Sequence, residues 1–355
     1  MSRPLSHAGG DLADGLWPSA GLEQVAECPI CGAAERMAIH QGLTDRAFRC
    51  APGEWNLYSC GRCGSCYLDP RPTRQTIELA YRNYRTHAEI GEPAPTEVSA
   101  PLRRWSRALV NGYCNWYLGT RLEPAWRLGA WLALAVPPSR RGLLRHLPRI
   151  AGGGRVLDVG AGNGIYLSRV RAAGWQVAGV EPDPVALAIA RRAGLDVRQG
   201  GIECFADEPE AFDFITMNHV IEHVHDPRAV LAQAMALLKP SGWLFLETPN
   251  VRSYGHRRFG RHWRGLEPPR HLVLFHWRSL EMLLREVGFA RVKRLPRGNV
   301  YPAIAAKSRA MSLGADPEAG VRPSLRDRLT GAMLDLKAML DCRGSEFITL
   351  MASKR

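Results

Sequence analysis

The chain has 355 residues, a formal net charge of +13, 46% hydrophobic residues and 23% charged residues. This balance is typical of a folded globular protein and excludes a disordered or fibrous chain. At about 150 residues per domain, the length favours one large core with a smaller module. The longest apolar run, residues 128–136, ends at two prolines and is too short to span a membrane, which takes about 20 residues.

The N-terminal residues do not have the apolar segment of a signal peptide, so we expect a cytoplasmic protein whose nine cysteines are reduced and available to metal ions. The basic residues are concentrated in two segments, with net charges of +8 over 101–150 and +11 over 251–310. This uneven distribution of positive charge favours an anionic partner, which could be a phosphate-bearing substrate, a membrane surface or a nucleic acid.

Four regions follow one another along the chain. Residues 1–27 are small and polar, which predicts a flexible arm, and residues 28–90 hold six of the nine cysteines, which predicts a small zinc-binding module ending in a helix at 73–86. Residues 91–150 combine a proline-rich linker with a basic, tryptophan-rich helical insert. Residues 151–355 form the main domain, with a helical insert at about 299–340.

The cysteines of the module come in two C-x-x-C-G pairs, at Cys28 and Cys31 and at Cys60 and Cys63. Four thiolates presented by two tight turns are the ligands of a closed, tetrahedral, structural zinc site. Cys50 and Cys66 lie close in sequence and remain alternative ligands.

From residue 154 onward, apolar β-branched runs alternate with helical stretches, which predicts parallel βαβ units. The expected strands are residues 156–159, 177–180, 212–217, 243–246, 291–295 and 347–352. The expected helices are residues 165–173, 184–193, 227–238 and 277–287.

The first of these strands enters a glycine-rich turn that contains Gly160, Gly162 and Gly164. Glycines allow a ligand to approach the backbone, and the following helix presents its free amides. Glu181 ends the next strand, where a carboxylate can accept both hydroxyls of a ribose. The pattern predicts a nucleoside-containing ligand, either a dinucleotide or S-adenosylmethionine (SAM).

Four ordered motifs together resemble those of the class I SAM-dependent methyltransferases: VLDVGAGNG, GVEPDP, FDFITMNHVIEHVHDP and LKPSGWLFLETP. With the cysteine module and the LDPRPT segment that follows it, the chain is similar to bacterial methyltransferases of sugars and cell-envelope glycans. The resemblance implies an α/β fold with a Rossmann-like, seven-stranded, doubly wound sheet whose last strand is antiparallel, preceded by a small N-terminal zinc-ribbon module and interrupted by helical inserts.

The same resemblance assigns roles to single residues. Asp158, Gly160 and Gly162 would hold the methionyl part of SAM, with Gly164 in the same loop, and Glu181 would hold the ribose. Ile202 and Glu203 would flank adenine, although Ile202 is equally suited to core packing. Asn218, at the end of the fourth strand, would meet the amino-acid end of SAM.

Proton removal from the acceptor is assigned to His223 or His271, with His219 third and Glu222 beside them. His219, Glu222 and His223 are spaced as on one face of a short helix, and an imidazole with an ordinary pKa near 6.5 suits a general base. Ubiquinone-type O-methyltransferases hold a divalent metal with a similar E-x-x-E-H motif. His219 replaces its first acid, which disfavours Mg²⁺; the histidines and Glu222 could also be purely structural.

These observations predict SAM-dependent methyl transfer to a hydroxyl, or less readily a carbon, of a glycan, nucleotide-sugar or lipid-linked saccharide. The aromatic and arginine-rich insert at 101–150 is suited to peripheral contact with the anionic inner face of a membrane, or to a cap over the active site. One alternative is an RNA methyltransferase, which the acidic charge of the zinc module disfavours. A SAM-binding but inactive scaffold or glycan-recognition subunit is the other, and the oligomeric state stays open.

Overall fold

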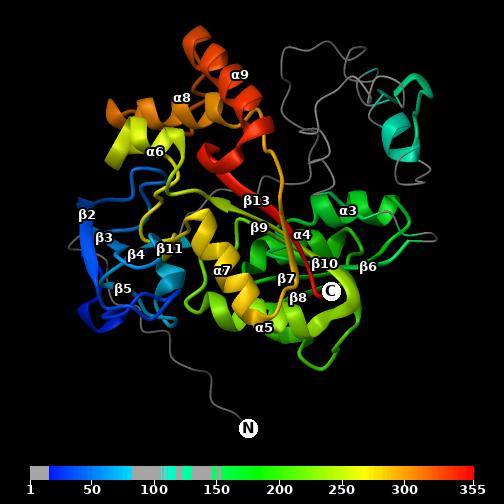
Figure 1. The fold of residues 1–355 in the computed structure, drawn as a ribbon, viewed down its shortest axis with the longest axis horizontal. Helices are drawn as coiled ribbons and strands as arrows, with labels where there is room; N and C mark the ends of the chain where they lie inside the picture. Colours follow the sequence, from blue (N-terminus) through cyan, green and yellow to red (C-terminus); the bar gives the residue numbers. More distant parts are fainter. Residues whose placement is uncertain are drawn as a thin grey trace.

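The structure is a computed structural model that describes residues 16–81 and 153–355, together with positions 105, 108–109, 111–116, 122–129, 146–148 and 150. The N-terminal module lies beside a large sheet, and a layer of three helices lies at one end of the molecule (Figure 1). Most of the expected linker and tryptophan-rich insert, and the first part of the expected arm, fall outside the described residues.

The main domain is built on a seven-stranded sheet with the order β12-β13-β10-β9-β6-β7-β8. Its strands are β6 (Arg155–Val159), β7 (Gln176–Glu181), β8 (Val197–Gln199), β9 (Phe212–Asn218), β10 (Leu238–Pro249), β12 (Arg291–Arg294) and β13 (Phe347–Ser353). β13 runs antiparallel to both of its neighbours, and all other adjacent pairs are parallel. The predicted doubly wound sheet with an antiparallel last strand is confirmed.

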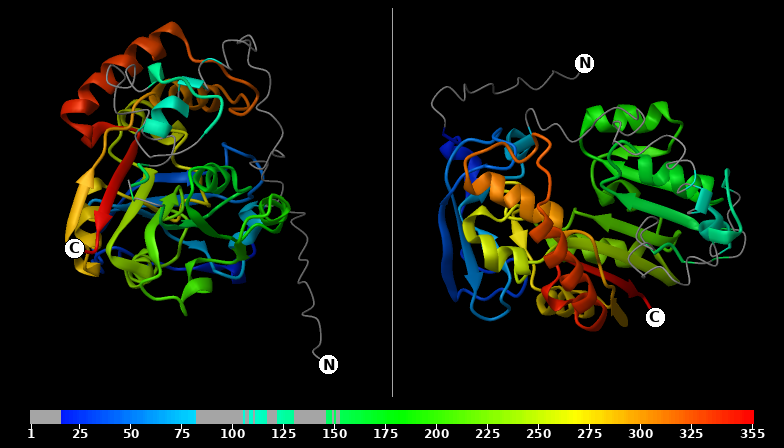
Figure 2. Two further views of the ribbon diagram at one scale, coloured as in Figure 1. Left: turned by 90° about the vertical axis from the view of Figure 1, so that its right-hand side faces the viewer. Right: turned by 90° about the horizontal axis from the view of Figure 1, so that it is seen from above.

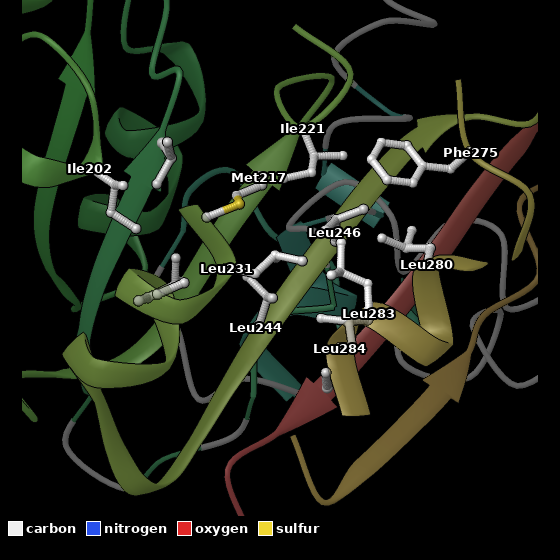
Figure 3. Packing of buried hydrophobic residues seen from close by; sticks show 14 of the residues in the cluster. Ile202, Met217, Ile221, Leu231, Leu244, Leu246, Phe275, Leu280, Leu283 and Leu284 are labelled. Carbon is white, nitrogen blue, oxygen red and sulfur yellow. The ribbon is translucent and has the colours of Figure 1, made fainter. Parts of the chain in front are cut away.

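Helices cover both faces of this sheet. α3 (Ile165–Ala172) and α4 (Pro184–Arg192) pack on one face, and α5 (Pro227–Leu237) and α7 (Trp277–Val287) pack on the other. Figure 3 shows the second layer, in which Leu231 of α5 and Leu283 of α7 meet Leu244 and Leu246 of β10. The leucines of α7 recur every three or four residues, so the period of the sequence sets which face is buried.

Local sequence signals explain where several helices begin. Asp183 and Asp226 each cap a helix by accepting a hydrogen bond from a backbone amide of the first turn, and each precedes a proline at the first helical position. Ser324 and Asp327 form a reciprocal capping box at the start of α9 (Leu325–Leu340). The expected insert at 299–340 is two helices, α8 (Tyr301–Ser312) and α9. α8 packs against α9, α6 (Tyr254–Phe259) and η5 (Gly260–His262).

The module centres on an antiparallel sheet with the order β11-β4-β3-β2. β2 (Arg36–Leu43), β3 (Trp55–Cys60) and β4 (Cys66–Leu68) come from the module itself, whereas β11 (Val273–Leu274) comes from the main domain. The two regions thus share a sheet, which Figure 2 shows from two further directions.

Two expectations for the N-terminal region are corrected. The arm ends earlier than residue 27, because Trp17 is buried against Trp55 and β1 (Leu22–Glu23) pairs with β5 (Arg71–Pro72). The predicted helix at 73–86 is, within the described residues, only the short 3₁₀ helix η2 (Ile77–Tyr81). The packing of Trp17 depends on a distant partner, so the polar composition of the arm could not reveal it.

A buried ion pair fixes the module to the main domain. Arg270 donates to both carboxylate oxygens of Asp45, at 2.5 and 3.0 Å, and to the carbonyl of Ala80, and both charged side chains are fully buried. The carboxylate of Asp45 also accepts three backbone amides of its own loop. The pKa of Asp45 is lowered because the hydrogen bonds and charge of Arg270 outweigh burial.

No helix in the described part of the chain has the length and apolar character needed to cross a bilayer.

Candidate active site

The glycine-rich loop between β6 and α3 has the conformation that its composition requires. Gly160, Gly162 and Gly164 all have positive φ, between 55° and 82°. A Cβ on Gly160 would lie 2.7 Å from Val220 Cγ2, and a Cβ on Gly164 would lie 2.3 Å from Leu195 Cδ1. The loop therefore exposes bare backbone beside the N-terminus of α3, where a ligand can approach closely.

Glu181 ties this loop to the next strand. Its carboxylate accepts the Gly162 amide at 2.7 Å and the Asp183 amide at 2.9 Å, and the side chain is largely buried at the end of β7. A carboxylate is a hydrogen-bond acceptor only, which is the character that a ribose diol requires of its partner. The loop and Glu181 together fit the nucleoside and methionyl parts of SAM.

The other predicted cofactor residues lie around the same strand ends. Asp158 is fully buried in β6 and accepts the hydroxyl of Thr216 in β9 at 2.5 Å. Ile202 is buried in the core, and Glu203 accepts the Gly201 amide at 2.8 Å. Asn218 ends β9 in register with Glu247 of β10. Their contacts with SAM remain predictions.

The segment from His219 to His223 is a bend and a turn, not the expected short helix. His219 has φ of +56°, a left-handed conformation that a right-handed helix cannot include, and its amide donates to Glu247 as an extension of the sheet. The first helical residue is Pro227. The turn nevertheless brings the imidazole of His219 within 3.1 Å of the Glu222 carboxylate.

His219 and Glu222 form a polarised pair. Glu222 is fully buried, and its other oxygen accepts the Thr248 hydroxyl at 2.9 Å. Burial opposes its ionisation, but the hydrogen bond with His219 and the neighbouring histidines lower the pKa of Glu222 to about 2. For His219, burial is outweighed by the hydrogen bond and charge of Glu222, so its pKa is raised above 6.5. A third of the His219 side chain is exposed.

The other two histidines lie close together on the inner side of this pair. The rings of His223 and His271 are 4.8 Å apart. Nδ1 of His223 donates to the Arg270 carbonyl at 3.0 Å and is also 3.1 Å from the Tyr81 hydroxyl. Nδ1 of His271 donates to the Gly265 carbonyl, and burial lowers the pKa of His271 to about 4. Both rings are held through backbone carbonyls.

Glu222, His223 and His271 place one oxygen and two nitrogens within 4.8 Å of one another. Mg²⁺ prefers a set of oxygen ligands with near-octahedral geometry, so two imidazoles do not suit it. Both oxygens of Glu222 are also engaged by His219 and Thr248. The residues at this position do not fit a magnesium site.

The two cysteine pairs converge, as their spacing predicts. The sulfur atoms of Cys28, Cys31, Cys60 and Cys63 all lie within 4.8 Å of one another, with separations of 3.6 Å for Cys28–Cys63 and 3.5 Å for Cys31–Cys60. Zn–S bonds of about 2.3 Å in a tetrahedron place sulfurs about 3.8 Å apart, so the cluster fits a zinc ion.

Within the cluster the pKa of Cys63 is lowered, whereas hydrogen bonding with Cys63 and burial raise the pKa of Cys28, and burial raises that of Cys31. Hydrogen bonds from Cys28 and from the amide of Ser65 lower the pKa of Cys63 to about 5. Cys50 instead contacts Asp45 and Arg270, and burial raises the pKa of Cys66 to about 12. Cys50 and Cys66 are therefore outside the cluster.

A pocket lies among α6, α8 and α9, and one of its lining residues, Arg297, links it to His219 through Glu247. Its lining residues come from α6, α8, α9 and the segments before α8 and β13, and they are Tyr254, Arg257, Arg297, Val300, Tyr301, Leu334, Asp335, Lys337, Asp341, Gly344, Ser345 and Glu346. Arg297 pairs at 3.0 Å with Glu247, which is 3.9 Å from Nε2 of His219. Phe347, next to Glu346, packs edge-on against the His219 ring at 4.5 Å.

The chain was compared with models of protein families and with solved structures. Residues 135–293 match a family model described as a methyltransferase domain. The chain contains a class I, SAM-dependent methyltransferase domain. Among solved structures, it is similar to a SAM-dependent methyltransferase of Thermotoga maritima described as a possible histamine N-methyltransferase, with 21% identity, a TM-score of 0.40, and coverage of 71% of this chain and 100% of that one.

Curated relatives match part of this domain. The ubiquinone biosynthesis O-methyltransferase of Bordetella bronchiseptica is 39% identical over 123 residues, covering 33% of this chain and 51% of that protein. The protein of the same name from Albidiferax ferrireducens is 33% identical, covering 32% and 48%. The chain thus spans about half the length of these relatives.

The relatives correct one expectation from the sequence. The prediction of a glycan, nucleotide-sugar or lipid-linked saccharide acceptor is wrong, because these relatives are named for a quinone pathway. The cysteine module suggested envelope glycans, but it lies outside the residues that the methyltransferase family model matches.

Several residues of the site were not singled out from the sequence. Glu247 and Thr248 belong to a motif that was recognised, but their contacts with His219 and Glu222 appear only in the fold. Glu267 pairs with Arg264 and lies near His271. Its pKa is lowered because the charges of Arg264, His271 and Arg270 outweigh burial. A carboxylate four residues before a histidine was the available signal.

Proposed function

We propose that the chain transfers the methyl group of SAM to a hydroxyl oxygen of a small hydroxylated aromatic ring of the quinone-pathway type. The observation that carries this proposal is the His219–Glu222 pair, which follows the end of β9 directly. The names of the curated relatives support oxygen as the accepting atom and a quinone precursor as the acceptor class.

The chain's own residues have two tasks in this reaction. SAM, when bound, supplies a methyl group on a sulfonium that is already an activated leaving group. The glycine loop and Glu181 hold the donor in place. The remaining task is to align the acceptor hydroxyl and remove its proton.

His219 is the side chain best placed to take that proton. Glu222 accepts from Nδ1–H, which leaves the lone pair on Nε2, 3.9 Å from Glu247, and the raised pKa makes His219 a stronger base. His271 has a pKa of about 4 and is almost completely buried, so it is the weaker base at neutral pH. The order of preference from sequence therefore changes to His219 first, with His223 and His271 positioning the turn.

The pocket suits an aromatic acceptor. Tyr254 and Tyr301 stand 5.4 Å apart, edge to face, and Val300 and Leu334 add apolar surface. Arg257 and Arg297 provide positive charge for an acidic or phenolic substituent. The walls thus combine aromatic and apolar side chains with charged groups of both signs, including Asp335, Asp341 and Glu346.

We also propose that the four-cysteine cluster holds a structural zinc ion. Four thiolates leave no open position for a catalytic water, and Gly32 and Gly64 take the positive φ that closes each turn. The cluster braces the module whose sheet includes β11, two residues after His271. Zinc would therefore act on the site through the fold.

The experiment combines SAM binding with methyl transfer. Purified protein is incubated with radiolabelled SAM and a panel of hydroxylated aromatic rings, with a saccharide panel and a transfer RNA as controls. We expect label in the aromatic ethers alone. Label in RNA or saccharide would overturn the assignment, and tight SAM binding without turnover on any acceptor would favour an inactive scaffold.

A further inference from the structure

The outer face of α9 is an unusual surface. Seven of its residues are exposed and apolar, namely Leu325, Leu329, Ala332, Met333, Leu336, Met339 and Leu340. At 100° per residue they fall within an arc of about 120°. Of the sixteen large hydrophobic side chains that are exposed among the described residues, six belong to this stripe. Among the others, Trp105 and Trp126 contact each other, but no other single helix of the described residues carries as many.

The inner face of the same helix holds it to the protein. Asp327, Gly331 and Ala338 are buried on the opposite side, where Gly331 lies against Pro302 of α8 and Asp327 pairs with Arg309 at 2.5 Å. The helix is therefore anchored by small and polar residues and presents its large apolar residues outward. α9 lies at the periphery of the molecule in Figures 1 and 2.

Basic side chains border the stripe on both sides. Arg326 and Lys337 follow one edge, Arg328 follows the other, and all three are exposed. The carboxylate beside Arg328, Asp335, faces inward, where it accepts the Asn299 amide at 2.8 Å. An apolar face bordered by arginine and lysine is typical of a helix lying in the interface of a bilayer, where the long side chains reach the headgroups.

We propose that α9 docks this protein on the surface of an anionic phospholipid bilayer. The leucine and methionine stripe enters the boundary between headgroups and acyl chains, and Arg326, Arg328 and Lys337 pair with lipid phosphates. A lipid surface fits better than a second copy of the chain, because a net charge of +13 and positive borders on both sides of the stripe oppose self-association.

Docking through α9 would also place the pocket near the bilayer. This consequence rests on the proposed function. Leu334 and Lys337 of α9 line the pocket, so its wall and the docking stripe belong to one helix. An acceptor that partitions into the bilayer would then be delivered beside His219.

Cosedimentation of the full chain with vesicles tests docking without any acceptor present. Binding is expected to phosphatidylcholine vesicles that contain phosphatidylglycerol, to be weaker with phosphatidylcholine alone, and to fall as salt is raised. The combined variant Leu329→Gln, Met333→Gln and Leu336→Gln should lower the partition coefficient about 100-fold. The matched control, Met37→Gln with Val185→Gln, removes exposed apolar groups elsewhere and should bind as the wild type does.

SAM affinity shows that each variant is folded, and methyl transfer to a water-soluble acceptor without vesicles tests the proposed function separately. Equal vesicle binding by the stripe variant and the wild type would overturn the docking proposal. Failure of the wild type to bind vesicles would also overturn it. If the wild type then sediments as a dimer and the stripe variant as a monomer, the stripe is an interface between two copies of the chain.

Discussion

The two halves of the active site are built in different ways. The cofactor half, from Gly160 to Glu181, comes from one βαβ unit, and its contacts join residues about twenty positions apart. The acceptor half brings together four residues from four separate segments, namely His219, Glu247, Arg297 and Phe347. The first half can therefore be recognised from a short motif, whereas the second half exists only after the whole domain and its module have folded together.

The largest expected effect concerns the cysteine cluster, which supports the acceptor half from outside. Cys60→Ser removes one of four thiolates, and structural zinc in small domains contributes about 10–16 kcal/mol. We expect loss of zinc and unfolding of the module, measured by metal analysis and thermal denaturation. Cys204→Ser, outside the cluster, should keep both zinc and stability; zinc-free wild-type protein purified without chelator would contradict the assignment.

His219 tests the acceptor half directly. His219→Gln should lower the single-turnover rate by about 10²–10⁴-fold, the usual contribution of a general base, with SAM affinity unchanged. His223→Gln and His271→Gln should have smaller effects on the rate and larger effects on stability, because both rings hydrogen-bond to backbone carbonyls and His271 is buried. If all three variants keep near-normal rates, methyl transfer proceeds by alignment alone.

The Asp45–Arg270 pair tests whether the module and the acceptor half fold as one unit. Arg270→Met leaves a buried carboxylate without its partner, and we expect a loss of about 3–5 kcal/mol in the free energy of unfolding by urea. Arg285→Met, which breaks the more exposed Glu281–Arg285 pair, should cost less than about 1 kcal/mol. Similar losses in the two variants would show that the module is only loosely attached.

This comparison also explains what could be predicted from the sequence. The glycine loop, the cysteine pairs and six of the seven strands of the main sheet follow from periodicity and spacing over short distances. No range was predicted for β8, and β10 begins five residues before its expected start. The turn at His219 was mistaken for a helix because the spacing of His219 and His223 gives no sign of a left-handed residue. β11 and the Asp45–Arg270 pair join segments more than 200 residues apart, and no local pattern encodes such a contact.

Glu181 provides the corresponding test of the cofactor half. Glu181→Ala should weaken SAM binding by about 1.5–3 kcal/mol, or roughly 10- to 150-fold, because a charge-assisted contact with the ribose is lost. Isothermal titration calorimetry measures this change, with the exposed Glu210→Ala as a control. Unchanged affinity would restrict Glu181 to holding the Gly162 amide.

The smallest expected effect is a pH dependence of the methyl-transfer rate that SAM binding does not share. The pKa of His219 is raised, and a general base must be neutral, so the rate should fall about tenfold per pH unit below that raised pKa. SAM affinity has no such dependence on His219.

Stability should move in the opposite sense, because protonated His219 pairs with Glu222. That contribution is fully present below pH 6.5 and is lost as the pH rises through the raised pKa. Glu222, whose pKa is about 2, contributes stability above its ordinary value near 4.5, and this is lost as the pH falls toward 2. Rates and urea midpoints measured across the same pH range should therefore show opposite slopes near neutrality, and His219→Gln should flatten both. Parallel slopes would mean that a different group titrates in the acceptor half.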